Sequence, residues 1–211
     1  MSYSTVSELY NDVQLYMNRN EASIVNKIPM WVNMAEDELD RRLRHPANEA
    51  LVEYQVIKGQ RQIPAPANLA ELKFIRVPDA DRILYRRSIE TLFDLPIGDD
   101  YPTGFASVSN QYVLNFEAKQ DFLVEYCFYM VPDKLSNQNA SNTYLTLCGD
   151  LLLYLTLSEG FSYDMNLEDS AYFRQKAEKV LADLEEQIKK EERSGSTLVT
   201  FASADALSNY F

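Results

Sequence analysis

The spacing of apolar residues changes twice along this chain, and this change constrains the fold more than any other feature. Near both ends, apolar residues recur every three to four positions, as they do along one face of a helix. Between about residues 51 and 131, short runs rich in valine, isoleucine, phenylalanine and tyrosine take their place, which is typical of strands. The sequence therefore predicts an α+β protein in which a β-rich segment is inserted between helical segments.

Two helices are expected before the β-rich segment and two after it. The first begins with a capping box at Thr5 and Glu8, and Pro29 kinks the second helix or starts a new one. The third is apolar on nearly every side and is expected to be buried. The expected ranges are 5–17, 21–44, 142–161 and 166–192. Short connections favour packing of the four helices as a discontinuous bundle, from which the β lobe projects.

The middle of the chain predicts an antiparallel lobe rich in hairpins. Ser109 and Asn110 lie between two strand-like runs and read as a tight turn. A short helix is expected at about 88–93. The strand-like runs are 51–57, 72–77, 82–86, 104–108, 111–116 and 122–131.

These patterns divide the chain into three parts. Residues 1–48 and 133–193 form the helical bundle, 49–132 form the β-rich insertion lobe, and 194–211 form an extended C-terminal arm. The arm follows no helical stripe, yet it is rich in large apolar residues, which are Leu198, Val199, Phe201, Leu207, Tyr210 and Phe211. Two interpretations stay open: the arm packs on its own domain, or it packs on a neighbouring protein.

The charge balance argues against a broad nucleic-acid-binding surface. The chain has 20 Lys and Arg against 32 Asp and Glu, a net charge of −12, and phosphate binding needs the opposite balance. The second helix carries an acidic and then basic face that is expected to be solvated. Its members are Glu36, Asp37, Glu38, Asp40, Arg41 and Arg42.

The residues that could carry catalysis do not assemble into a site. His45 is the single histidine and lies at a helix end, where a cation suits the helix dipole. Cys127 and Cys148 have apolar neighbours and read as buried thiols in a reducing compartment. No nucleotide-binding, hydrolase or zinc motif is present. We therefore expect no enzyme, metal or cofactor; a pair of aspartates in a turn, such as Asp99 and Asp100, is the remaining catalytic alternative.

The sequence predicts neither a secretion signal nor a membrane span. The first residues have no basic and apolar signal-peptide pattern. The longest uninterrupted apolar stretch of the most apolar segment is 151–155, whereas a membrane span needs about 20 apolar residues. A cytoplasmic product is expected.

Taken in order, several segments resemble the head-to-tail adaptor proteins of tailed bacteriophages, as in short-tailed phages. The resemblance covers residues 4–193. The segments that carry it are IPMWVNMAEDELDRRLRHP, ILYRRSIETLFDL, YPTGFASVSNQYVLNF, FLVEYCFYMVPDKLSNQNASNTYL and GDLLLYLTLSEGFSYD, followed by a long charged helix.

The resemblance implies a dodecameric ring beneath the portal protein that extends the DNA channel and carries the tail or nozzle proteins. It also implies C-terminal arms that reach the portal, and DNA that passes without being bound specifically. The protein would then belong to the head–tail interface of the virion, after assembly in the host bacterial cytoplasm. The alternatives are a stopper or tail-completion protein, and a non-viral cytoplasmic interaction module.

Within this interpretation, two further groups of residues are expected to have roles. Acids in β-lobe loops are candidates for lining the channel, because passing DNA must not be held; these are Asp94, Asp99 and Asp100. Mixed charges on the second and last helices are candidates for contacts between neighbouring subunits; these are Asp37, Asp40, Arg41, Arg42, Glu185 and Glu186.

Overall fold

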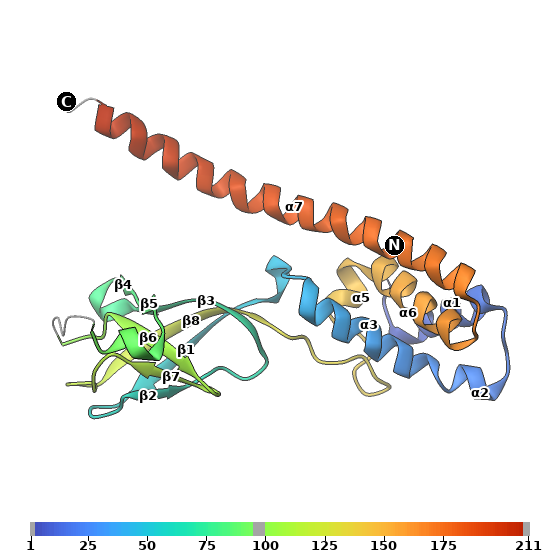
Figure 1. Ribbon diagram of the computed structural model, residues 1–211, viewed down its shortest axis with the longest axis horizontal. Helices are drawn as coiled ribbons and strands as arrows, with labels where there is room; N and C mark the ends of the chain where they lie inside the picture. Colours follow the sequence, from blue (N-terminus) through green and yellow to red (C-terminus); the bar gives the residue numbers. More distant parts are fainter. Residues whose placement is uncertain (1–2, 95–99, 209–211) are drawn as a thin grey trace. The chain divides into compact units, whose positions relative to one another are not determined.

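The computed structural model describes residues 3–94 and 100–208, with side chains described as far as Glu191. It divides into two compact units (Figure 1). A helical unit comprises 1–46 and 132–211, and a β unit comprises 47–131. The mixture of helices and largely antiparallel sheets confirms the expected α+β class.

The helical unit is built around α6, which packs against α1, α3 and α7. The helices of this unit are α1 (Val6–Met17), α2 (Ala22–Val25), α3 (Ile28–Arg42), α5 (Thr143–Leu147), α6 (Gly149–Tyr163) and α7 (Leu167–Ser208). Pro29 lies in the first turn of α3, where its missing N–H costs nothing. It therefore starts a new helix after α2, which is one of the two outcomes that the sequence allowed.

Two helix boundaries differ from the sequence expectation. The helix expected at 142–161 is interrupted at Cys148, whose φ and ψ of −134° and 43° are not helical. The backbone of residues 194–208 continues α7 and does not form an extended arm. No proline interrupts this segment, so no residue in it forbids the helix, although Gly195 disfavours the helix by about 1 kcal/mol relative to alanine and the serines and threonines disfavour it by less.

Close packing at the centre of the helical unit requires Gly160 of α6. A Cβ atom at this position would lie 2.9 Å from the Sδ of Met17 and 3.1 Å from Cε3 of Trp31. Because both distances are shorter than ordinary contacts, no larger residue fits without displacing the indole of α3. The single tryptophan is thus packed between α3 and α6.

The β unit contains two four-stranded sheets, in the orders β1-β8-β3-β4 and β2-β7-β6-β5. The strands are β1 (Glu49–Val56), β2 (Gln62–Pro64), β3 (Leu69–Val77), β4 (Arg82–Ile83), β5 (Tyr85–Arg86), β6 (Gly104–Val108), β7 (Gln111–Leu114) and β8 (Phe122–Met130). Short 3-10 turns, Pro46–Asn48 and Pro78–Ala80, precede β1 and β4. Ser109, with φ of 54°, makes the predicted two-residue turn between β6 and β7.

One strand pair departs from the expected antiparallel pattern: β5 pairs with β6 in parallel. A parallel pair needs a long crossover connection, and residues 87–103 provide it. This connection includes α4 (Ile89–Leu92), which is capped by Ser88 and lies near the short helix that the sequence predicted.

The two sheets face each other across one apolar core. It contains Val56, Ile75 and Tyr126 of the first sheet, and Phe105 and Leu114 of the second. On the other face of the second sheet, α4 places Leu92 against Ala106 and Val113 in a small separate cluster. The β unit therefore has its own core, independent of the helical core around α6.

Candidate interaction surfaces

A buried carboxylate on α3 fixes the loop that leads from the β unit back to the helical unit. Glu36 is 0% exposed, and its Oε1 accepts hydrogen bonds from the backbone N–H of Leu135 at 3.2 Å and from Nδ2 of Asn142 at 2.6 Å. Burial raises the pKa of Glu36, and these hydrogen bonds oppose that rise. The expectation that this helix face is solvated is wrong at Glu36, because the loop folds over it.

The same loop is tied to α3 a second time by Lys134. Its ammonium lies 2.9 Å from Asp37 and also binds Asp40. Asp40 in turn accepts a hydrogen bond from the hydroxyl of Tyr144, at 3.0 Å. Two of the residues predicted to contact a neighbouring subunit, Asp37 and Asp40, therefore have partners within the chain.

A cluster of alternating charges joins α3 to α7. Arg42 donates two hydrogen bonds to the carboxylate of Glu178, at 2.7 and 2.6 Å, and one to Glu38 at 2.8 Å. Arg174 donates to Glu38 at 2.7 Å. Burial raises the pKa of Glu38, but hydrogen bonds from Arg174 and Arg42 outweigh it and leave that pKa below its ordinary value. The mixed charges of the two helices thus complement each other inside one chain.

The other residues that were predicted to contact a neighbouring subunit have fewer interactions within the chain. Arg41 is exposed and has no charged partner among the described side chains. On α7, Glu185 lies 3.8 Å from Lys189, and Glu186 lies 2.7 Å from Lys190. Arg42 and Glu185 line one pocket of about 300 Å³ between the end of α3 and α7, without an ion pair between them.

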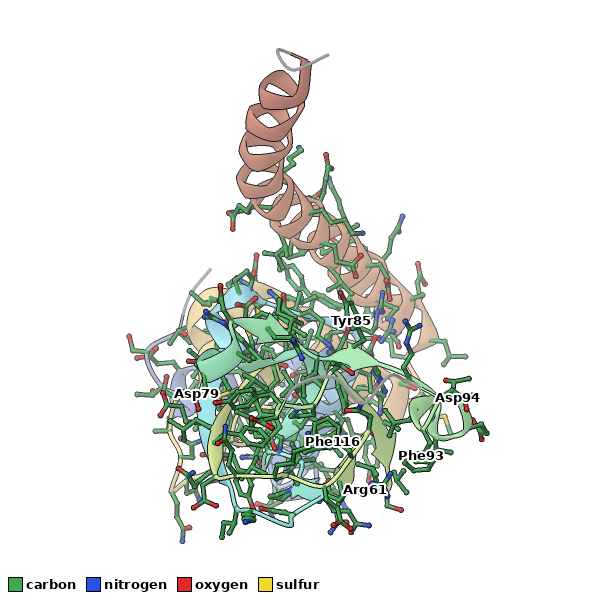
Figure 2. The ribbon with its side chains drawn as sticks, turned by 90° about the vertical axis from the view of Figure 1, so that its left-hand side faces the viewer. Arg61, Asp79, Tyr85, Phe93, Asp94 and Phe116 are labelled. Atoms are coloured by element: carbon green, nitrogen blue, oxygen red, sulfur yellow. The ribbon has the colours of Figure 1, made fainter. Side chains whose placement is uncertain are left out.

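The structure describes two of the three acids that were predicted to line the channel, Asp94 and Asp100. Asp94 is exposed beside α4, and Asp100 is exposed with its carboxylate 3.6 Å from the ammonium of Lys119. Figure 2 shows Asp94 next to Phe93 on one flank of the β unit. The guanidinium of Arg61 lies 4.4 Å from the centre of the Phe93 ring. Asp99 lies outside the described residues.

The predicted arm lies beyond the described side chains. For Leu198, Val199, Phe201 and Leu207 the structure gives the helical backbone of α7 only, and Tyr210 and Phe211 are outside the described residues. Their contacts with a portal or a neighbouring subunit stay a prediction.

Sequence reasoning missed a groove between α3 and α6. Its volume is about 210 Å³, and its lining residues are Met30, Trp31, Met34, Glu159, Ser162 and Tyr163. The indole Nε1 of Trp31 is buried here without a hydrogen-bond acceptor, and its ring centre lies 5.6 Å from that of Tyr163. The signal in the sequence was the pair of methionines four residues apart, outside the main apolar stripe of α3.

Burial shifts the pKa of both cysteines and of the single histidine: it raises the pKa of Cys127 and Cys148 and lowers that of His45. Burial raises the pKa of the Cys148 thiol to about 12, so a reactive thiolate does not form near neutral pH. Burial lowers the pKa of His45, against the opposing charge of Glu191. This lowering disfavours the cationic form in which His45 would complement the helix dipole.

The part of the chain that the structure describes contains neither a candidate membrane-spanning helix nor a candidate metal-binding cluster. In that part, no helix is both long and apolar enough to cross a membrane. No group of three or more His, Cys, Asp and Glu within the same ranges could hold a metal ion.

Comparison with known families gives one match across most of the chain. The model of a family described as SU10 adaptor protein matches residues 4–200, a span that includes both the helical unit and the β unit. No curated protein matches the chain.

Proposed function

Because this chain belongs to the SU10 adaptor protein family, we propose that it is the phage adaptor that forms a ring beneath the portal protein. Membership of that family makes it a structural component of a phage virion. The single observation that carries the proposal is the span of the match, which runs from residue 4 to residue 200. In this role the ring, with dodecameric symmetry like that of the portal, extends the DNA channel and carries the tail or nozzle proteins.

The residues that line the proposed channel are Asp94, Asp99 and Asp100. Exposed carboxylates repel the DNA backbone, so passing DNA is not retained. Asp94 and Asp100 are exposed, which supports this assignment. DNA then passes without a specific binding site.

The proposed contact with the portal uses the C-terminal segment 194–211. It carries the apolar residues already named, and a large aromatic side chain buried in an interface contributes about 2 kcal/mol or more to binding. The segment lies after the last described side chain that packs in the helical core, Ile188. Binding through this segment therefore need not disturb the fold of either unit.

The experiment is deletion of residues 195–211, followed by measurement of binding to purified portal rings of the same phage. The deleted chain should keep the circular dichroism of both units and lose portal binding. A matched control replaces Ser203 and Ser208 by alanine in the full chain, and it should bind normally. Unchanged binding of the deleted chain would contradict the proposed role of the segment, and failure of the full chain to bind any portal would contradict the adaptor role.

The proposed subunit contacts include Arg41, Arg42, Glu185 and Glu186. Arg41 has no partner among the described side chains, whereas Arg42 is held by Glu178. Exposed ion pairs contribute only about 0–1 kcal/mol each, so we propose that the free subunit is stable and that the portal acts as a template for assembly in the host cytoplasm.

A further inference from the structure

The β unit has two free sides that lie at opposite edges of its sheets. β1 is one edge of the first sheet and β4 is the other, while β5 is an edge of the second sheet. The chain passes directly from β4 to β5 through Leu84, whose N–H donates to the carbonyl of Ile75 at 2.8 Å. We call residues 49–56 the β1 side and residues 82–87 the β4–β5 side (Figure 1).

The β1 side is acidic and partly apolar. It contains Glu49 and Glu53 and no base. Glu49 is bound by Lys73, but Glu53 is exposed and lies directly across from another acid, Glu125. Glu125 lies 3.8 Å from the guanidinium of Arg76, whereas Glu53 has no charged partner among the described residues. Leu51, two residues before Glu53 on the same face of the strand, is 63% exposed.

The β4–β5 side has the opposite charge. It contains three arginines and no acid, in a chain of net charge −12. Arg86 and Arg87 are both exposed, and neither has a carboxylate partner among the described residues. Ile83 and Tyr85 are 53% and 64% exposed, and Figure 2 shows Tyr85 at the rim of the β unit opposite Arg61, which precedes β2.

We propose that the β1 side of one copy of this chain packs against the β4–β5 side of the next copy. Glu53 then meets Arg86 and Arg87, and Leu51 meets Ile83 and Tyr85. The two sides are complementary. The β1 side offers an acid without a charged partner and the β4–β5 side offers bases without one, and both sides have exposed apolar side chains that can pack together. Because the two sides are different surfaces, the contact is head-to-tail, which is the kind that closes into a ring.

This inference rests on the proposed ring, and it names a surface by which neighbouring copies recognise each other. The competing explanation is that these charges only protect the edges from pairing with other strands, as charged residues on edge strands commonly do. Under that explanation, copies of the chain would not attract each other through these sides.

The test uses two full-length variants with reversed charge, Glu53→Arg and Arg86→Glu with Arg87→Glu, in sedimentation velocity over a range of concentrations. Because the portal is the proposed template for the closed ring, the wild-type chain alone should self-associate only weakly, into short oligomers, as its concentration rises. Each variant alone should bind itself about tenfold or more weakly, because like charges then face each other. An equimolar mixture should recover association, since every contact in an alternating chain again joins an acidic side to a basic side.

A control variant, Glu168→Arg, makes the same charge change at an exposed position of α7 and should associate like wild type. The inference is overturned if the wild type stays monomeric at its highest soluble concentration. It is also overturned if the reversed variants associate normally, or if their mixture does not recover while circular dichroism shows both to be folded. This assay contains no portal protein. A negative result would therefore contradict the contact between copies but not the adaptor role, and failure of the chain to bind the portal would contradict the adaptor role but not this contact.

Discussion

At the scale of single residues, Glu36 shows how one buried charge holds together segments of the helical unit that are far apart in the chain. Its carboxylate accepts hydrogen bonds from Leu135 and Asn142, and Asn142 also caps α5 by accepting a hydrogen bond from the N–H of Leu145. A buried charge is tolerated only when it has such partners. The position of α5 therefore depends on a residue of α3 that is more than 100 positions earlier in the chain.

We expect Glu36→Ala to lower the free energy of unfolding by about 1–3 kcal/mol, because it leaves buried donors without an acceptor. Glu36→Gln should cost much less, since the amide oxygen can accept both hydrogen bonds. Chemical denaturation of the two variants measures the difference. Asp183→Asn, which removes an exposed charge on α7, is the control and should have little effect. If Glu36→Ala and Glu36→Gln lowered the free energy of unfolding equally, the hydrogen bonds to Glu36 would not be the cause.

The pH dependence of the same site has a defined sign. Because the pKa of Glu36 is raised in the folded state, the folded protein binds this proton more readily than the unfolded chain does. The corresponding stability is present at low pH and is lost as the pH rises through the folded pKa. The stability of wild type relative to Glu36→Gln should therefore increase as the pH is lowered, and a decrease would contradict the burial that raises this pKa.

At the scale of elements, the contact of α3 with α7 combines apolar packing around α6 with the cluster of Glu38, Arg42, Arg174 and Glu178. Arginine binds carboxylates in pairs of parallel hydrogen bonds, as Arg42 binds Glu178 here. Burial of Glu38 strengthens its interactions relative to those of fully solvated pairs. The charged side chains of the two helices thus help to specify the position of one helix against the other.

A double-mutant cycle of Arg42→Ala and Glu178→Ala should give a coupling energy of about 1 kcal/mol, at the upper end for a half-exposed pair. The coupling should fall as salt is added, because both side chains contact solvent. Hydrogen bonding from Arg42 lowers the pKa of Glu178, so the coupling should also vanish as the pH falls through that pKa.

The pair of Glu186 and Lys190, also an ion pair but within one exposed turn of α7, provides the control. Its coupling should be smaller than that of Arg42 and Glu178, because both of its side chains are largely exposed to solvent. A coupling for Arg42 and Glu178 no larger than this would show that the cluster does not fix α3 against α7.

At the scale of the whole molecule, the β unit has the properties of an inserted domain. Its first strand begins and its last strand ends side by side, with Glu49 opposite Tyr129, and its core is separate from that of the helical unit. The chain therefore enters and leaves the β unit at adjacent positions, and a unit with its own core can fold without the rest of the chain.

We therefore expect residues 47–131, produced alone, to fold with the circular dichroism of a β protein and to unfold in one cooperative transition. The helical segments joined by a short linker in place of 47–131 should remain helical. An excised β unit that shows no cooperative transition would mean that its stability depends on the rest of the chain.

The sequence by itself determined the alternation of helical and β segments and the turn at Ser109, because each depends on local spacing or on one residue's backbone preference. At Pro29 it allowed either a kink or a new helix, and the structure decided that a new helix, α3, starts there. The sequence also carried the resemblance to the adaptor family to which the chain belongs. Only the tertiary structure decided that Glu36 is buried, that Arg42 pairs with Glu178 and that β5 runs parallel to β6. These depend on contacts between residues far apart in the chain, and a helical face rich in charge looks the same in sequence whether water or a folded loop covers it.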